Sequence, residues 1–136
     1  MTSHFIGKVS VRAIIEKDGK VLVTRDEKDN MWEIPGGRID KGEGLADGLC
    51  REIREELGVD VIVGGFVHSG QFLHIRDNVM QLVVTFVCTL ADPTAMLTAN
   101  RREVAEVRWI NVAEMHELAF IHESKEALLA YWADQK

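Results

Sequence analysis

The sequence is poor in the residues that mark disulfide-bonded, membrane-spanning or nucleic-acid-coating proteins. Its two cysteines, Cys50 and Cys88, form no CxxC pair and fall on predicted apolar faces, where they are expected as small core residues. No apolar run approaches the roughly 20 residues of a transmembrane helix, and no signal-peptide pattern is present. A reduced, cytoplasmic setting without a membrane partner is therefore expected.

Positive charge is scarce as well. The 22 Asp and Glu residues outnumber the 16 Lys and Arg residues, which gives a net charge of -6. Broad nucleic-acid binding needs clustered Lys and Arg to neutralise phosphates, so it is not expected. A small phosphorylated substrate stays compatible if bound metal ions supply the positive charge. With 136 residues, 46% of them hydrophobic and 28% charged, the chain suits one globular domain spanning residues 1–136.

Alternating apolar residues and turn signals predict strands on both sides of a central helix. The expected strands lie at 5–16, 21–24, 32–34, 60–63, 66–73, 79–90 and 106–110, and the expected helices at 45–57, 111–118 and 124–133. Asp18-Gly19 predicts a hairpin turn, Gly64-Gly65 a bend or bulge, Gly58 a helix C-cap and Asn111 an N-cap. This layout predicts an α/β fold in which helices pack on a mixed sheet.

The central helix carries three glutamates that do not lie on its most solvated side. Spaced at about 100° per residue, its apolar residues fill one arc of roughly 140°. They are Leu45, Ala46, Leu49, Cys50, Ile53 and Leu57. Glu56 falls inside this arc and Glu52 at its edge, with Glu55 further round, and no Lys or Arg at helical spacing neutralises Glu52 or Glu56. Because a divalent cation would turn this repulsion into attraction, the helix predicts a Mg²⁺ site.

The segment from Gly37 to Val59 resembles the signature of the Nudix hydrolase family. Five residues separate Gly37 from Glu43, seven more precede Arg51, and the sequence then reads REIREELGV through Val59. The preceding tract WEIPGG, from Trp32 to Gly37, is also typical of Nudix proteins. The alternative interpretation is a solvated helix face on which Arg51 pairs with Asp47 or Glu55.

The resemblance implies a Nudix fold, an α/β/α sandwich with a mixed β-sheet, and an enzyme that hydrolyses the diphosphate linkage of a nucleoside diphosphate joined to another moiety. It implies Mg²⁺, with Mn²⁺ as a substitute, held by Glu52, Glu55 and Glu56 with the carbonyl of Gly36. Glu103 lies where some Nudix enzymes supply a further ligand or base, although an exposed loop acid is the alternative. Glu52 is the first candidate for the general base. Structural roles are expected for Gly37, Glu43, Arg51 and Gly58.

Substrate contacts are predicted less sharply. Arg25 and Arg38 are candidates for gripping phosphate, with surface salt bridges as the alternative. Trp32, Phe5 and Phe72 are candidates for stacking on a base, with core packing as the alternative, and His68 and His74 are candidates for lining the same sheet face. The downstream proline and tyrosine that mark ADP-ribose and dinucleoside polyphosphate hydrolases are absent, since the chain has only Pro35, Pro93 and Tyr131.

By elimination, the pattern resembles a MutT-like hydrolase of nucleoside triphosphates. Two alternatives stay open: a processing enzyme for RNA 5′ ends, and a catalytically silent nucleotide-sensing or interaction module. Dimers are frequent in the family, so a homodimer is compatible with the resemblance.

Overall fold

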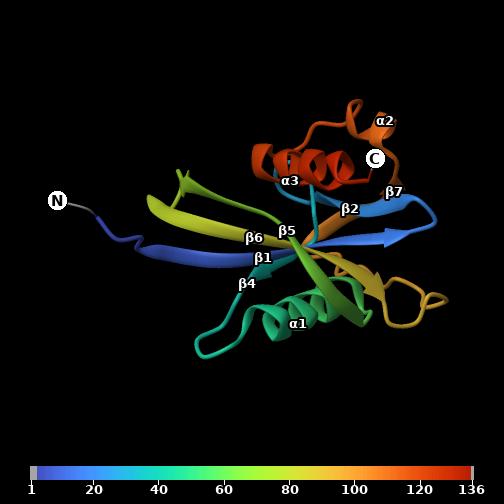
Figure 1. Ribbon diagram of the computed structural model, residues 1–136, viewed down its shortest axis with the longest axis horizontal. Helices are drawn as coiled ribbons and strands as arrows, with labels where there is room; N and C mark the ends of the chain where they lie inside the picture. Colours follow the sequence, from blue (N-terminus) through green and yellow to red (C-terminus); the bar gives the residue numbers. More distant parts are fainter. Residues whose placement is uncertain (1–2, 136) are drawn as a thin grey trace.

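The computed structural model describes residues 3–135 and places a mixed sheet between two helical layers (Figure 1). Helix α1 covers one face of the sheet, and α2 and α3 lie on the other. The strands are β1 (Gly7–Lys17), β2 (Lys20–Asp26), β3 (Trp32–Glu33), β4 (Gly36–Arg38), β5 (Val61–His74), β6 (Val79–Leu90) and β7 (Val104–Ile110). The helices are α1 (Leu45–Leu57), α2 (Val112–Met115) and α3 (His122–Ala133). The α/β sandwich expected from the sequence is confirmed.

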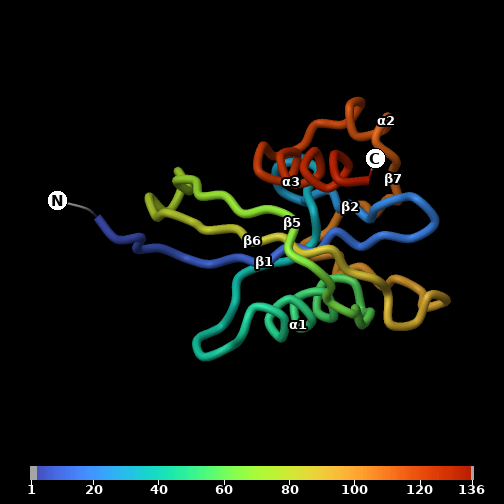
Figure 2. The backbone as a smooth tube through the Cα atoms, viewed as in Figure 1, coloured from blue at the N-terminus to red at the C-terminus, as the bar shows by residue number. Residues whose placement is uncertain are grey.

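Strand β1 lies in the middle of the sheet and pairs with β2, β4 and β6. It runs parallel to β6 from Gly7 beside Met80 to Ile15 beside Cys88, and it pairs antiparallel with β2 and β4. Strand β5 lies at the edge, antiparallel to β6, and β7 pairs with β2. Figure 2 shows the chain leaving β4, looping away from the sheet and returning as α1. This path places the loop directly beside the start of the helix.

Alternation along β1 separates the two halves of the core. Val11, Ala13 and Ile15 pack with Leu49, Ile53 and Leu57 of α1. Ile14 packs on the opposite side with Ala127 and Leu128 of α3. The two-residue period of a strand and the apolar stripe of each helix account for this division. Among residues 3–135, no helix has both the length and the apolar character needed to cross a membrane.

Most predicted elements are confirmed; the short strand β4 was not expected, the strands expected at 60–63 and 66–73 form the single strand β5, and the other differences lie at element ends. The strand expected at 79–90 matches β6, and β5 runs through Gly64-Gly65 with register shifts on either side of Phe66, as a bulge requires. Asn111 caps α2, but this helix ends at Met115 rather than near residue 118. Helix α3 begins at His122, two residues before the expected start, because Ser124 is buried and its hydroxyl accepts a hydrogen bond from the Ile34 backbone instead of capping the helix.

Candidate active site

The two glycines after Pro35 bring the backbone against β1 and against helix α1. Gly36 adopts a φ of 145° and pairs with Arg12, and a Cβ there would overlap the carbonyl oxygen of Val11. A Cβ at Gly37 would overlap the carboxylate of Glu52. Residues larger than glycine therefore cannot hold this turn without moving the strand or the glutamate. The turn presents the backbone of Gly36 and Gly37 directly beside the acidic helix.

Arg51 ties the loop before α1 to the helix. Its guanidinium donates to both oxygens of Glu43 at 2.8 and 3.0 Å and to the carbonyl of Arg38 at 3.0 Å. The hydrogen bonds from Arg51, with one from the backbone of Asp40, lower the pKa of Glu43 to about 2. Glu43 is therefore held ionised in the loop, and the geometry gives Arg51 a positioning role.

Arg51 also contacts the predicted metal ligands. Its Nη1 lies 3.1 Å from Glu52 and 3.2 Å from Glu55. The sequence places no Lys or Arg at helical spacing from Glu52, yet the adjacent Arg51 contacts it, because a flexible guanidinium can reach a neighbour that helical spacing does not predict. Burial nevertheless raises the pKa of Glu52, with Arg51 opposing the shift.

Glu56 is the least compensated acid in the site. Its side chain is enclosed, with only 6% of the residue exposed, and its Oε1 has no hydrogen-bond partner among the described residues. Burial raises the pKa of Glu56 to about 8; the charge of Arg12 opposes this shift, and the charges of Glu33, Glu103 and Glu52 add to it. An enclosed carboxylate surrounded by other acids is costly unless a cation reaches it.

The donor set fits a hard divalent cation. Mg²⁺ prefers carboxylate and carbonyl oxygens and retains several waters, and the unpartnered Oε1 of Glu56 is such an oxygen. Within residues 3–135, no three Asp, Glu, His or Cys side chains already converge on one point suited to a metal ion. The hydrogen bonds from Arg51 engage Glu52 and Glu55 in this state. The guanidinium of Arg51 is therefore the positive group that neutralises Glu52 and Glu55 here.

The loop carrying Glu103 is fastened to the end of α1. The backbone N–H groups of Thr98 and Asn100 donate to the carbonyls of Leu57 and Glu56, both at 2.8 Å. Gly58 closes the helix in the left-handed conformation, with φ of 67°. Glu103 itself is exposed, yet its charge is near enough to raise the pKa of both Glu52 and Glu56.

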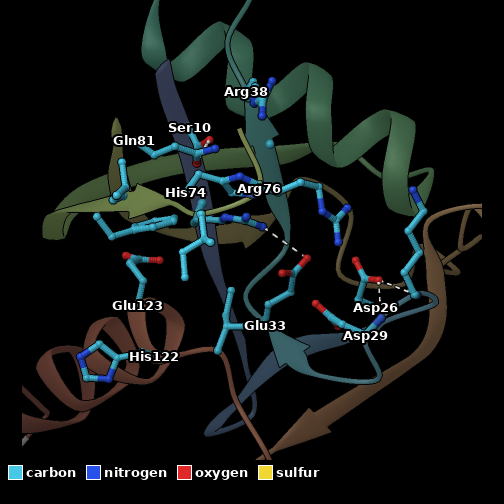
Figure 3. Close-up of a pocket in the computed structure, with 17 residues that line it drawn as sticks. Ser10, Asp26, Asp29, Glu33, Arg38, His74, Arg76, Gln81, His122 and Glu123 are labelled. Atoms are coloured by element: carbon cyan, nitrogen blue, oxygen red, sulfur yellow. Dashed lines mark hydrogen bonds and ion pairs between the residues drawn. The ribbon is translucent and has the colours of Figure 1, made fainter. Parts of the chain in front are cut away.

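A pocket of about 920 Å³ opens beside this cluster, on the α3 face of the sheet (Figure 3). Of the residues singled out from the sequence, Gly37, Arg38, Phe72 and His74 line it. The pocket also contains polar residues that sequence reasoning missed, namely Ser10, Arg12, Asp26, Lys28, Asp29, Glu33, Arg76, Gln81, His122 and Glu123. Figure 3 shows Glu33 on one side of this space and Glu123 on another, with His74 and Gln81 above Glu123.

Arg12 connects the pocket to the acidic cluster. Its Nη1 donates to the carbonyl of Ile34 at 2.9 Å and lies 3.6 Å from Glu33, while its Nε is buried and has no hydrogen-bond partner in the part of the chain that the structure describes. Its charge opposes the raised pKa values of Glu33, Glu56 and Glu123, which burial raises first in each case. The sequence signal that could have identified Arg12 is its position as a lone arginine among the apolar residues of β1.

Several predicted substrate contacts take their alternative roles in this structure. Arg25 pairs with Glu106 at 3.3 Å, and Arg38 pairs with Asp77 at 3.2 Å while still lining the pocket. Trp32 is 5% exposed and packs in the core, so core packing rather than stacking describes it.

Phe5 and His68 are also outside the pocket lining. Phe5 is partly exposed near Gly7, away from the pocket lining. His68 lies 3.8 Å from both Glu123 and Glu126 instead of lining the pocket with His74.

The chain is similar to known proteins over nearly its whole length. A family model described as "NUDIX domain" matches residues 7–131. The CTP pyrophosphohydrolase of Escherichia coli (strain K12) is 42% identical over 65 residues, covering 45% of this chain and 48% of that protein. Nudix hydrolase 5 of Arabidopsis thaliana is 31% identical over 119 residues, covering 82% of this chain and 38% of that protein. The chain thus spans less than half the length of these curated relatives.

Solved structures share the whole fold. The solution structure of the E. coli ORF135 protein superposes with a TM-score of 0.77 at 27% identity, covering 93% of this chain and 89% of that one. A NUDIX hydrolase from Nitrosomonas europaea superposes with a TM-score of 0.79 at 19% identity, covering 96% and 92%. The second similarity bears on the fold alone.

Proposed function

The chain belongs to the Nudix family, and from that premise we propose that it is a Mg²⁺-dependent pyrophosphohydrolase of small nucleotides, with nucleoside triphosphates as its substrate class. The observation that carries this proposal is the enclosed carboxylate of Glu56, whose Oε1 has no hydrogen-bond partner within residues 3–135, with the charges of Glu52, Glu33 and Glu103 around it. Such a group is costly in the protein alone and is stabilised by a divalent cation.

We assign each acidic residue of the site a role in metal binding or in proton transfer. Glu52, Glu55, Glu56 and Glu103 would hold the metal, with the carbonyl of Gly36 as a further ligand. The bound metal supplies positive charge to the diphosphate oxygens and lowers the pKa of water. Glu52 accepts the proton of the attacking water, because its carboxylate lies against the Gly37 backbone at the edge of the pocket. Arg51 fixes the position of Glu52 through their 3.1 Å contact.

We assign substrate binding to the pocket, which lies on the side of Gly37 away from Glu52. Arg38 is half-exposed, and its guanidinium pairs with the partly exposed Asp77, a weak contact that a phosphate can replace. Phe72 offers part of its ring to a base. The similarity to a CTP pyrophosphohydrolase supports a nucleoside triphosphate. The free thiols of Cys50 and Cys88 agree with a reduced, cytoplasmic setting.

Turnover of a substrate panel tests this proposal. Nucleoside triphosphates, nucleotide sugars, ADP-ribose, dinucleoside polyphosphates and a 5′-triphosphorylated RNA are incubated with Mg²⁺ or with EDTA, and released phosphate and pyrophosphate are measured. We expect Mg²⁺-dependent release of pyrophosphate from nucleoside triphosphates. Preference for the RNA would favour the RNA 5′-end alternative, and nucleotide binding without turnover of any compound would favour a sensing module.

A further inference from the structure

Strand β5 is a long edge of the sheet without a charged residue. It has 14 residues and pairs only with β6, so its other side has no strand beside it in the described chain. Residues 61–75 contain no Asp, Glu, Lys or Arg, although 28% of all residues are charged. Edge strands of soluble proteins are usually short or charged, because a free edge can pair with another strand. Strand β5 therefore lacks the usual protection against pairing.

The other strands that pair with a single strand in the described chain follow the usual pattern. Strands β3, β4 and β7 have two, three and seven residues. Each of them carries charge: Glu33 in β3, Arg38 in β4, and Glu106 with Arg108 in β7. The long uncharged edge is therefore specific to β5.

The free side of β5 is accessible along its C-terminal half. From His68 beside Thr85 to His74 beside Val79, its pairing with β6 is regular, after the register shifts around Phe66. Among residues 3–135, no backbone hydrogen bond joins residues 68–73 to any segment other than β6. Figure 1 shows this part of the β5–β6 hairpin extending past α3. Five exposed large apolar side chains lie on β5 or next to it, namely Ile62, Phe66, Phe72, Leu73 and Ile75.

We infer that β5 pairs antiparallel with β5 of a second copy of this protein across residues 68–74, which joins the two sheets into one. A two-fold axis relates two identical strands in the antiparallel sense, and each copy offers one such edge, so the assembly closes as a dimer. Overlap of the whole regular segment places Gln71 opposite Gln71 of the second copy. A ladder of this length makes about seven main-chain hydrogen bonds, which is within the range for a specific interface.

Charge favours a second copy as the occupant of this edge. Each copy has a net charge of -6, so two copies repel each other where their acidic surfaces meet. Contact between two uncharged strands keeps acids out of the interface and removes no ion from water. Just beyond the ladder, the same overlap brings the exposed Phe66 of each copy close to the exposed Ile75 of the other. Apolar contacts therefore close both ends of the paired segment.

The paired segment also forms part of the pocket wall. Phe72, Leu73 and His74 line the pocket, so in the dimer the strand of the second copy borders that wall. Pairing of β5 needs neither metal nor nucleotide and is measured without turnover. Failure of the dimer is therefore distinguishable from failure of the proposed hydrolysis.

Sedimentation equilibrium in EDTA over a wide range of protein concentration measures the association. Gln71 is exposed, so Gln71→Lys places two positive charges opposite each other in the dimer, and Gln71→Glu places two negative charges there. Thr89→Lys is the matched control. It adds the same charge at an exposed position of β6 that lies beside Ile62, outside the paired segment.

The wild-type protein and Thr89→Lys are expected to form a reversible dimer with a dissociation constant in the micromolar range. Gln71→Lys and Gln71→Glu, each alone, are expected to raise that constant by on the order of fivefold or more, because like charges directly opposite each other in a sheet repel. An equal mixture of these two variants is expected to restore association, since each Lys then faces a Glu. Recovery in the mixture also shows that both variants are folded.

A wild-type protein that stays monomeric at every concentration overturns the inference, as does assembly beyond a dimer. A dimer that neither Gln71 variant weakens uses another surface, which also overturns it. Equal weakening by Gln71→Lys and Thr89→Lys would show that total charge rather than β5 governs association. A mixture that associates no better than each variant alone would contradict the pairing of Gln71 with Gln71.

Discussion

At the scale of single residues, Glu56 has two opposite effects: burial of its charge lowers stability, and the same carboxylate is a proposed metal ligand. It lies within the buried, apolar stripe of α1, where an apolar side chain would be the usual occupant. Instead it carries an acid whose pKa is raised to about 8 by burial. Either protonation of Glu56 or a cation beside it removes the free-energy cost of burying its charge. The same group that destabilises the metal-free protein is thus the one that we propose as a direct metal ligand.

The stability of the metal-free protein is therefore expected to fall as the pH rises. Glu56 titrates near 4.5 as a free acid and near 8 in the fold, so the native state binds the extra proton between these values. Stability from this group is complete below about 4.5 and is lost as the pH rises through 8. Burial raises the pKa of Glu33, Glu52 and Glu123 too, so these acids act in the same direction.

Urea unfolding in EDTA between pH 5 and pH 8 measures this effect. The Glu56→Gln variant is expected to lose less stability over that range than the wild-type protein, because its amide does not ionise. Glu117→Gln, at an exposed position, serves as the control and should follow the wild-type curve. Parallel curves for all three proteins would show that Glu56 is already ionised and compensated in the fold.

At the scale of elements, the turn, the loop and helix α1 behave as one unit held at three points. The Gly36-Gly37 turn packs on β1 and Glu52, Arg51 binds the loop through Glu43, and the 91–100 loop closes the far end of the helix. Each attachment limits the movement of the helix relative to the sheet. The glutamates are consequently placed by their surroundings as well as by helical spacing.

The C-terminal attachment gives a prediction about stability. Gly58 has a φ of 67°, and a Cβ there would lie 3.2 Å from Thr98 Cβ. Gly58→Ala is expected to lower the free energy of unfolding by about 1 kcal/mol, since L-residues disfavour the left-handed region. Gly65→Ala is the control, because its Cβ would meet no atom within 4 Å. If both variants unfold at the same urea concentration, the left-handed cap does not contribute as argued.

Elements were also the scale at which the sequence was most informative. The helix, the apolar alternation of β1 and β6 and the turn at Asp18-Gly19 follow from local periodicity and local turn chemistry. The signature therefore located Glu52, Glu55 and Glu56 correctly on α1. The short strand β4 was missed, because its pairing with β1 depends on a distant segment rather than on its own three residues.

At the scale of the whole molecule, the pocket is made by contacts that no local pattern encodes. Glu33 and Arg12 meet through pairing of distant strands, Gln81 meets Phe72 across β5 and β6, and Glu123 arrives on a helix from the end of the chain. Spacing along the sequence does not predict these neighbours. The reach of Arg51 toward Glu52 was missed for a related reason, because a long side chain bends beyond helical periodicity.

The whole arrangement places the glutamates of α1 on one side of Gly37 and a pocket of about 920 Å³ on the other. We propose that the acids of α1 form a site for a divalent cation completed by Glu56. Binding of Mn²⁺, followed by the electron paramagnetic resonance of the free ion, tests that claim most directly, with wild-type protein, Glu56→Gln and Glu117→Gln compared at one pH. We expect Glu56→Gln to weaken binding by on the order of tenfold or more, through loss of a carboxylate ligand, while Glu117→Gln binds as the wild-type protein does. Equal Mn²⁺ affinity in all three proteins would contradict the account.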